Sequence, residues 1–301
     1  MNNIEELSPV DKKSTTIEID EFSSNLIIEQ YKKIGLNVER FFIGINNVTL
    51  RKCSLTNYRY YSPFNCMGDD QFYQELQNLS ADYYPKNKWE HKKALKYINK
   101  NDKVLEIGCA TGYFLECCIQ KKAIATGIEL NKKAAAEAIS KGLDVKMKLI
   151  EDFAKNHQNE FDVICSFQVL EHISDVNSFI KNSLQCLKPG GLFIFGVPNN
   201  NPFIFKHDKF HTLNLPPHHA GLWNKESIEN TAKFFHLNTE YIGVSPLYEA
   251  KEWYNTQMIY YKKKNPFIST LMRLIPRPIY KLFIKSLSNY IEGKTILAVL
   301  K

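Results

Sequence analysis

The chain has 301 residues and a formal net charge of +7, which we interpret as spread along the sequence. This length suffices for one large core or two small ones, and the mild positive charge permits an anionic partner without requiring one. No run reaches the ~18 apolar residues of a membrane span, and the polar, acidic start predicts no signal peptide. Seven cysteines with no Cys-x-x-Cys pair favour a reducing, cytoplasmic location over a disulfide framework.

The N-terminal third predicts a helix, strands and a dense set of aromatic residues. Apolar positions at helical spacing predict a helix over 21–33, and alternating Val, Ile, Phe and Thr over 38–53 predict a β-hairpin. The aromatic residues between 58 and 89 form either a small satellite core or a lid whose tyrosines line a binding pocket. Cys53 and Cys66 have no partner ligands nearby, so we interpret them as packing residues.

The stretch from Val104 to Phe114 organises the rest of the sequence. A short apolar run predicts a buried strand, Gly108 and Gly112 break it, and an apolar-periodic helix follows. This order places backbone N–H groups and a positive helix end at the carboxyl edge of a sheet, where α/β folds bind ligands. The glycines allow a ligand to approach the backbone closely. Glu106, directly before the first glycine, favours a ligand that carries positive charge over a pyrophosphate.

Strands and helices alternate through the remainder, as in an α/β fold. The predicted strands are 123–129, 143–150, 161–167, 192–197, 239–244 and 295–300, and the predicted helices are 89–98, 131–141, 176–187 and 224–235. Lys188-Pro-Gly-Gly191 stops one helix and turns the chain sharply. Glu129 ends a strand 23 positions beyond Glu106. That offset is close to the ~20 residues at which nucleotide-binding folds place the acid that accepts ribose hydroxyls.

Two later segments have open interpretations. Residues 198–223 form a long, proline-bearing loop, and loops of this length are usually functional or disordered. We expect one functional member among its histidines, which are His211, His218 and His219. Residues 265–290 mix apolar with basic side chains, as in an amphipathic surface for anionic lipid. We favour instead a core helix pair, broken by Pro276 and Pro278.

Three segments together resemble class I S-adenosylmethionine-dependent methyltransferases. Glu106-Ile-Gly-Cys-Ala-Thr-Gly112 is similar to the family's acid-x-Gly-x-Gly-x-Gly cofactor loop, with Ala110 in place of the middle glycine. Val169-Leu-Glu-His172 is similar to the family's Val-Leu-Glu-His segment, and Leu187-Lys-Pro-Gly-Gly191 to its Leu-x-Pro-Gly-Gly turn. Residues 72–91 and Leu215-Pro-Pro-His-His219 further resemble bacterial methyltransferases of glycan and O-antigen loci. The resemblance covers residues 72–301 well and 1–71 loosely.

The resemblance implies an α/β fold with a seven-stranded, mostly parallel, Rossmann-like methyltransferase sheet and helices on both faces. An N-terminal α+β arm or lid region over 1–85 is expected to precede an S-adenosylmethionine-binding domain over 86–301. Within that domain we expect an acceptor loop over 198–223 and a helical insertion over 246–290.

The implied cofactor is S-adenosylmethionine, with Glu106 at its amino-acid end and Glu129 on its ribose. The family brackets adenine after the third strand, where its usual acid falls on Leu149 here, so Glu151 or Asp152 replaces it. Tyr84, Lys88 and Trp89 are placed near the cofactor by the resemblance alone. The full predicted set is Tyr84, Lys88, Trp89, Glu106, Gly108, Cys109, Ala110, Gly112, Tyr113, Phe114, Glu129, Leu130, Ile150, Glu151, Phe167 and Gln168.

Methyl transfer is an in-line displacement that needs an oriented acceptor and a base for the acceptor's proton. His172 is the first candidate base because it follows the strand at the methyl-donor end, although a histidine that only orients Glu171 fits the same position. His219 and His218 are the next candidates. No cluster has metal-ligand spacing, so we predict no metal, while magnesium use by some sugar methyltransferases of this fold keeps a metal-assisted acceptor open.

The leading prediction is O-methylation of a sugar or sugar-linked small molecule in surface glycan synthesis. The alternative keeps the cofactor and changes the acceptor to a quinone, lipid or secondary metabolite. An NAD-dependent epimerase or oxidoreductase conflicts with Glu106, and a non-catalytic cofactor-binding protein leaves the histidine-bearing loop unexplained. We predict no nucleic-acid partner, because Ser166-Phe-Gln168 differs from the Asp/Asn-Pro-Pro-aromatic sequence of base-amine methyltransferases. Peripheral membrane contact through 265–290 stays open.

Overall fold

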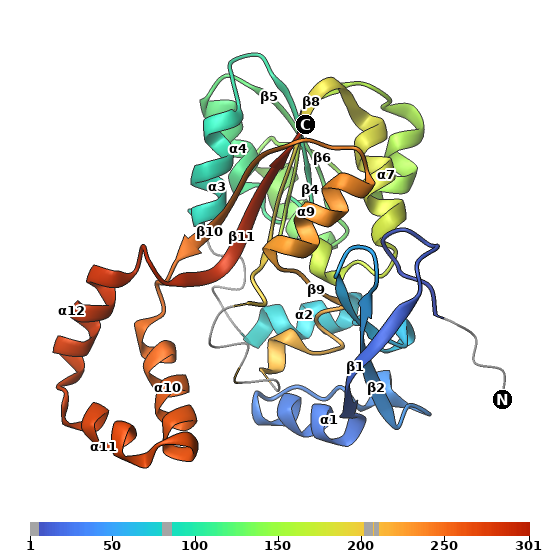
Figure 1. The fold of residues 1–301 in the computed structure, drawn as a ribbon. Coiled ribbons are helices and arrows are strands. Elements are labelled where there is room, and N and C mark those ends of the chain that lie inside the picture. The colour runs from blue at the N-terminus through green and yellow to red at the C-terminus, as the bar shows by residue number, and fades with distance from the viewer. Residues whose placement is uncertain (1–5, 80–85, 202–206, 208–210) are drawn as a thin grey trace.

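The computed structural model describes residues 6–79, 86–201, 207 and 211–301, which form two β-sheets (Figure 1). The larger sheet has the strand order β10 (Thr239–Pro246), β11 (Glu292–Leu300), β8 (Leu187–Pro198), β7 (Phe161–Phe167), β4 (Lys103–Ile107), β5 (Ile124–Ile128) and β6 (Asp144–Lys146). Strands β4 to β8 pair in parallel, and β11 and β10 extend the sheet antiparallel. This architecture confirms the predicted seven-stranded, mostly parallel, Rossmann-like sheet.

Helices cover both faces of this sheet, which explains why its strands are continuous apolar runs. Successive residues point to opposite faces, so Val104 packs into one core and Leu105 into the other. One core includes residues of α3 (Trp89–Ala94), α4 (Tyr113–Gln120) and α5 (Lys132–Ser140). The other includes residues of α6 (Ile150–Phe153), α7 (Val176–Cys186) and α9 (Lys225–Phe234).

The smaller sheet is antiparallel and has the order β1 (Thr16–Ser23), β2 (Asn47–Cys53), β3 (Arg59–Ser62) and β9 (Gly221–Leu222). Together with α1 (Ser24–Lys33) and α2 (Asp70–Leu79) it encloses a core of its own. Buried Tyr61 and Phe72 belong to that core, as the satellite-core interpretation of the aromatic segment expects. Leu215 and Leu222 belong to it too, so the segment that carries His218 and His219 is attached to the N-terminal sheet.

That attachment bears on the expected division at residues 85 and 86. Strand β9 comes from within the loop predicted over 198–223, yet it pairs with β3 through Arg59↔Leu222 and Tyr60↔Gly221. The N-terminal arm and the second domain therefore share a sheet, and the division into 1–85 and 86–301 stays a prediction.

Two predicted elements are wrong in their extent. No hairpin forms over 38–53, because consecutive buried Phe41 and Phe42 suit the short helical turn Glu39–Phe42, and β2 pairs instead with β1 and β3. The strand predicted over 143–150 is only β6, since the exposed side chains Met147 and Leu149 end its alternation and Ile150 starts α6.

The C-terminal helices also contradict the sequence-based interpretation. Helices α10 (Ala250–Lys264), α11 (Pro266–Leu274) and α12 (Arg277–Leu287) project away from the large sheet (Figure 1), so residues 265–290 are no core helix pair. Their only buried cluster is the small one of Leu247, Tyr280 and Ile284. Within residues 250–290, the large apolar side chains at least two-fifths exposed are Ile259, Phe267, Leu271, Leu274, Ile275, Ile279, Leu282, Phe283 and Tyr290.

The positive charge is concentrated in these same helices, and our interpretation of an even spread is wrong. Residues 253–291 hold seven Lys and Arg residues and no Asp or Glu, which equals the net charge of +7. The 32 Lys and Arg residues elsewhere balance the 32 Asp and Glu residues. Among the residues that the structure describes, no helix is long and apolar enough to cross a membrane.

Candidate active site

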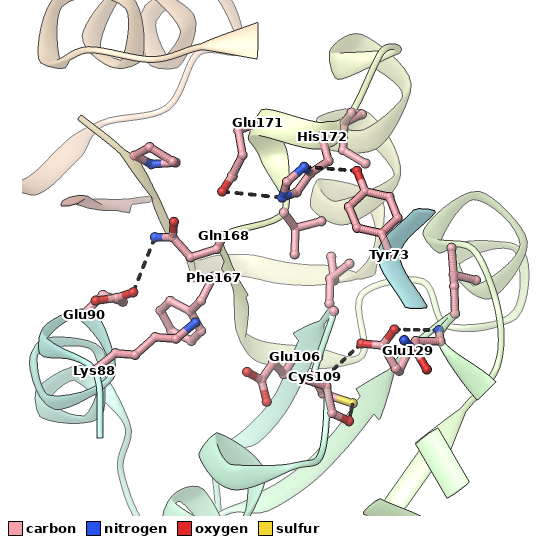
Figure 2. Close-up of a pocket in the computed structure, with 18 of the residues that line it drawn as sticks. Tyr73, Lys88, Glu90, Glu106, Cys109, Glu129, Phe167, Gln168, Glu171 and His172 are labelled. Carbon is pink, nitrogen blue, oxygen red and sulfur yellow. Dashed lines mark hydrogen bonds and ion pairs between the residues drawn. The ribbon is translucent and has the colours of Figure 1, made fainter. Parts of the chain in front are cut away.

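A cavity of about 940 Å³ lies at the carboxyl ends of β4, β5 and β7. Its walls come from the segments that follow these strands, from the start of α3, and from residues of the loop between β8 and β9. Figure 2 shows two groups of side chains in it, with Glu106 and Glu129 at one end and Glu171, His172 and Tyr73 at the other. The carboxyl edge is where parallel α/β sheets bind ligands.

The glycine loop after β4 depends on left-handed backbone. Gly108 and Gly112 have φ values of +75° and +84°, and Ala110 between them has +47°. A Cβ on Gly108 would lie 2.5 Å from Val169 Cγ2, and one on Gly112 would lie 2.2 Å from Leu143 Cδ1. The glycines are therefore needed for conformation and packing within the protein itself. Gly108 lines the cavity, whereas Gly112 does not line it and serves as the N-cap of α4.

Glu106, at the end of β4, is a buried carboxylate with an unsatisfied oxygen. Its side chain is 4% exposed, and its Oε2 has no hydrogen-bond partner. Burial raises its pKa to about 8, opposed by Lys88 and assisted by Glu129. A buried, unpaired carboxylate oxygen is costly unless a ligand supplies a cation or donor. The ammonium group of S-adenosylmethionine is such a ligand, so the residue present fits this cofactor.

Glu129, after β5, is held in place by one backbone group of the glycine loop and one at the start of α5. Its Oε2 accepts a hydrogen bond from Ala110 N at 2.8 Å, and its Oε1 accepts one from Asn131 N at 2.7 Å (Figure 2). Burial raises its pKa, and these backbone donors act in the opposite direction. Each carboxylate oxygen keeps a further lone pair for a ribose hydroxyl.

Most of the other predicted cofactor residues also line the cavity. They are Lys88, Trp89, Cys109, Ala110, Tyr113, Phe114, Leu130, Ile150, Glu151, Phe167 and Gln168. Phe114 and Phe167 make an edge contact at 4.8 Å between ring centroids and give the cavity an apolar wall. Glu151 accepts a hydrogen bond from Ser178 Oγ at 3.2 Å. Tyr84 lies outside the described residues.

Two buried acids in the cavity were missed by the sequence analysis as site residues. Glu90 accepts a 3.4 Å hydrogen bond from Gln168 Nε2, and burial raises its pKa. Glu171 is 1% exposed and its Oε2 has no partner, and burial raises its pKa to about 8. The sequence signal for Glu171 was its place in Val169-Leu-Glu-His172, whereas nothing in the pattern around Glu90 indicated burial.

The three candidate base histidines converge at the other end of the cavity. His172 follows β7, and its ring centroid lies 4.8 Å from that of His218 and 5.1 Å from that of His219. His172 Nδ1 lies 2.6 Å from the backbone oxygen of His218 and 3.2 Å from Tyr73 Oη. Its Nε2 lies 3.8 Å from Glu171 Oε1 (Figure 2). His211 lies apart, with its Nε2 3.5 Å from Glu252.

Burial sets the protonation of these rings. It lowers the pKa of His172 to about 4 and that of His218 to about 3, and it lowers the pKa of His219 well below its usual value. All three rings are therefore neutral near pH 7 and carry a nitrogen lone pair. Tyr73 lies against this group from α2, so the aromatic segment contributes to the cavity as well as to its own core.

A mostly parallel sheet with a glycine loop, an unpaired buried acid after the first strand and a backbone-held acid after the second defines a class of protein. The class is the S-adenosylmethionine-dependent methyltransferase of class I, and the cofactor is S-adenosylmethionine. Residues 82–260 match the model of the family described as Methyltransferase domain, and the chain belongs to that family.

Individual relatives share only part of the chain. A ubiquinone biosynthesis O-methyltransferase of Pseudomonas entomophila is 35% identical over 106 residues, which are 33% of this chain and 46% of that protein. The corresponding protein of Bordetella avium is 32% identical over 109 residues, or 34% and 45%. The chain thus spans less than half the length of these curated relatives. These names fit the alternative prediction, a quinone acceptor, better than the glycan one.

A solved structure agrees with the fold. The chain is similar to an S-adenosylmethionine-dependent methyltransferase from Thermotoga maritima, described as a possible histamine N-methyltransferase, with a TM-score of 0.50 and 16% identity. The match covers 77% of this chain and 96% of that one. At this identity the likeness concerns the fold alone.

Proposed function

We propose that the protein methylates a hydroxyl group of a hydrophobic, phenol-like acceptor of the quinone or lipid class at a membrane surface. The observation that carries this proposal is the neutral imidazole of His172 beside the buried carboxyl of Glu171, at the cavity end away from Glu106. When bound, the cofactor supplies a methyl group on a positively charged sulfur.

The two ends of the cavity have separate roles in this proposal. Glu106 would bind the ammonium group of the cofactor and Glu129 would accept hydrogen bonds from its ribose hydroxyls, and the cofactor would supply the methyl group. His172 accepts the acceptor's proton at Nε2, and the ionised form of Glu171, with its Oε1 3.8 Å from that nitrogen, stabilises the resulting imidazolium. The hydroxyl oxygen then forms its bond to the methyl carbon as the bond from that carbon to sulfur breaks.

The depressed pKa of His172 favours an acidic hydroxyl as the acceptor. Burial lowers the pKa of His172 to about 4, which makes it a weak base. A phenol, with a pKa of roughly 10, gives up its proton far more readily than the hydroxyl of a sugar ring. This argument and the names of the curated relatives support a quinone precursor over the glycan acceptor.

The C-terminal helices support a lipid-soluble acceptor. The exposed apolar side chains of α11 and α12 lie among seven basic residues with no acid, a composition that binds the interface of an anionic bilayer. Residues 248 and 249, just before α10, line the cavity, so α10–α12 begin beside it. A prenylated acceptor in the bilayer would reach the cavity from that side.

The test is methyl transfer from radiolabelled S-adenosylmethionine to a prenylated dihydroxybenzene, to the same ring without its chain, and to a nucleotide sugar. We expect turnover of the two phenols and greater turnover of the prenylated one on anionic vesicles. The double variant Leu274→Asp, Phe283→Asp should reduce both the co-sedimentation of the protein with vesicles and the increase in turnover that vesicles cause. The control Ile43→Asp changes a side chain that is 83% exposed in the N-terminal region. Turnover of the nucleotide sugar alone would contradict the proposal, and loss of self-association in the double variant would make α11–α12 a dimer contact.

A further inference from the structure

The hydrogen bonds of His172, His218 and His219 fix which nitrogen of each ring carries the proton. His172 Nδ1 faces the backbone oxygen of His218 at 2.6 Å, and His218 Nδ1 faces the backbone oxygen of Leu213 at 2.8 Å. A carbonyl oxygen only accepts hydrogen bonds, so both Nδ1 atoms carry the proton.

The third ring has the same tautomer for a related reason. His219 Nδ1 lies 3.1 Å from Asn214 Oδ1. The amide orientation of Asn214 is fixed, because its Nδ2 donates to Asn200 Oδ1 at 2.7 Å. All three neutral imidazoles therefore present an unprotonated Nε2.

This arrangement is typical of metal-binding histidines. Such residues donate one ring N–H to a carbonyl or carboxamide oxygen, which orients the ring and leaves the other nitrogen for the metal. One ring nitrogen from each of the three histidines lies within 4.8 Å of the others. A fourth group lies close by, since Glu171 Oε1 is 3.8 Å from His172 Nε2 and Glu171 Oε2 has no partner.

We propose that His172, His218 and His219 bind one divalent transition-metal ion through their Nε2 atoms, with Glu171 as a fourth ligand. Three imidazoles suit Zn²⁺, Fe²⁺, Co²⁺ or Ni²⁺ rather than Mg²⁺, which prefers oxygen ligands. Metal–nitrogen distances of ~2.1 Å place tetrahedral ligands about 3.4 Å apart, so the rings would move closer together on binding an ion.

The cluster could not be predicted from the sequence, because its members come from two distant segments. His172 follows β7, whereas His218 and His219 belong to a turn that Tyr31 fixes from α1 by donating to Leu215 O at 2.8 Å. Only the fold brings these residues together, and the spacing of 46 positions between His172 and His218 is no metal-ligand motif.

The ion would act on the acceptor of the proposed methyl transfer, and this step rests on the proposed function. The acceptor's oxygen would coordinate the ion, which lowers the pKa of the hydroxyl. Its proton would pass to water in the cavity, the oxygen would form the bond to the methyl carbon, and the electron pair of the carbon–sulfur bond would remain on sulfur. With the ion bound, the lone pair of His172 Nε2 is taken up by the metal, so the ion replaces His172 in promoting loss of the acceptor's proton, and the role of base proposed above applies to the metal-free protein.

The test is Co²⁺ binding by the full chain without a polyhistidine tag, after metal removal with a chelator. Titration is followed by calorimetry and by the visible absorption of bound Co²⁺. We expect one equivalent per chain, and at least a 100-fold loss of affinity in His218→Gln and His219→Gln. Asn214→Ala, which removes the acceptor for His219 Nδ1 together with the hydrogen bond to Asn200 Oδ1 but no proposed metal ligand, should lose about 10–100-fold. His236→Gln, at an exposed position away from the cavity, is the matched control and should bind as the wild type does.

Binding of S-adenosylhomocysteine by each variant shows that it is folded. Less than one equivalent of Co²⁺ on the wild type, or equal affinity in the wild type, His219→Gln and Asn214→Ala, would overturn the proposal. If the glutamine variants fail to fold, Asn214→Ala against His236→Gln decides. The titration contains no acceptor, so its result is independent of whether the acceptor is a phenol.

Discussion

The cofactor end and the acceptor end of the cavity are built differently. Glu106 lies at the end of β4 and Glu129 directly follows the adjacent parallel strand β5, and Glu129 is held by the backbone N–H groups of Ala110 in the glycine loop and of Asn131. The histidines come from the end of β7 and from a turn attached to the N-terminal sheet. The first end is therefore fixed by local chain geometry, and the second by contacts between distant segments. Substitutions at one end of the cavity should therefore leave the other end unaffected.

The largest effect is expected from Gly108→Arg. The new side chain would start at a φ of +75°, with its Cβ 2.5 Å from Val169 Cγ2, and would enter the cavity. Calorimetry should detect no S-adenosylhomocysteine binding. Gly142→Arg is the matched control, because Gly142 has a φ of +80° but no atom within 4 Å of its Cβ position. Equal binding by both variants would mean that the cofactor lies elsewhere.

His172→Ala should affect only the acceptor end. We expect turnover to fall about 10²–10⁴-fold, the range for loss of a general base, whether His172 takes the proton itself or holds the proposed ion that promotes its loss, with S-adenosylhomocysteine affinity unchanged. Initial rates and calorimetry on the same preparation measure the two quantities. His157→Ala serves as the control, since His157 stacks on Phe153 and does not line the cavity. Unchanged turnover in His172→Ala would remove His172 from the mechanism.

Glu129→Gln should lower the affinity for S-adenosylhomocysteine, but by less than Gly108→Arg does. The amide retains one oxygen acceptor, but it loses the charge that strengthens hydrogen bonds from Ala110 N and from ribose hydroxyls. We expect S-adenosylhomocysteine to bind about 10-fold more weakly, or ~1.4 kcal/mol. Glu137→Gln on the exposed face of α5 is the control. An affinity unaltered by Glu129→Gln would contradict the ribose assignment.

Cofactor binding should also release a proton from Glu106. Burial raises its pKa to about 8, so at pH 7 the free carboxyl is mostly protonated. A bound ammonium favours the ionised form, and affinity should therefore rise with pH up to about 8, by at most ~10-fold per unit. Calorimetry at pH 7 in buffers of different ionisation enthalpy measures the number of protons released on binding, which should be at most one. Glu106→Gln should lose that release, and retention of it would place the proton on another group.

The features that could be predicted from the sequence were those determined by residues close together in the chain. The strand over 161–167, the glycine loop and the acid 23 positions after Glu106 follow from local apolar runs and turn residues. Glu90 could not be identified in this way, because its burial depends on packing beside Gln168 after β7. Residues 265–290 were misread because apolar content predicts burial only when another element covers it.

The contact between the three histidines could not be predicted from the sequence. His172 was singled out by its motif and His218 and His219 by their loop, but their contact depends on the pairing of β9 with β3. That pairing joins residues 59–60 to 221–222 across most of the chain, and no periodicity encodes it.

The two-residue strand β9 has a consequence for how this enzyme diversifies. It attaches the turn that carries His218 and His219 to the N-terminal sheet, while the two acids proposed to bind the cofactor lie at the ends of β4 and β5. Exchange of the N-terminal segment for that of a homologous chain would then change the choice of acceptor without affecting the cofactor site.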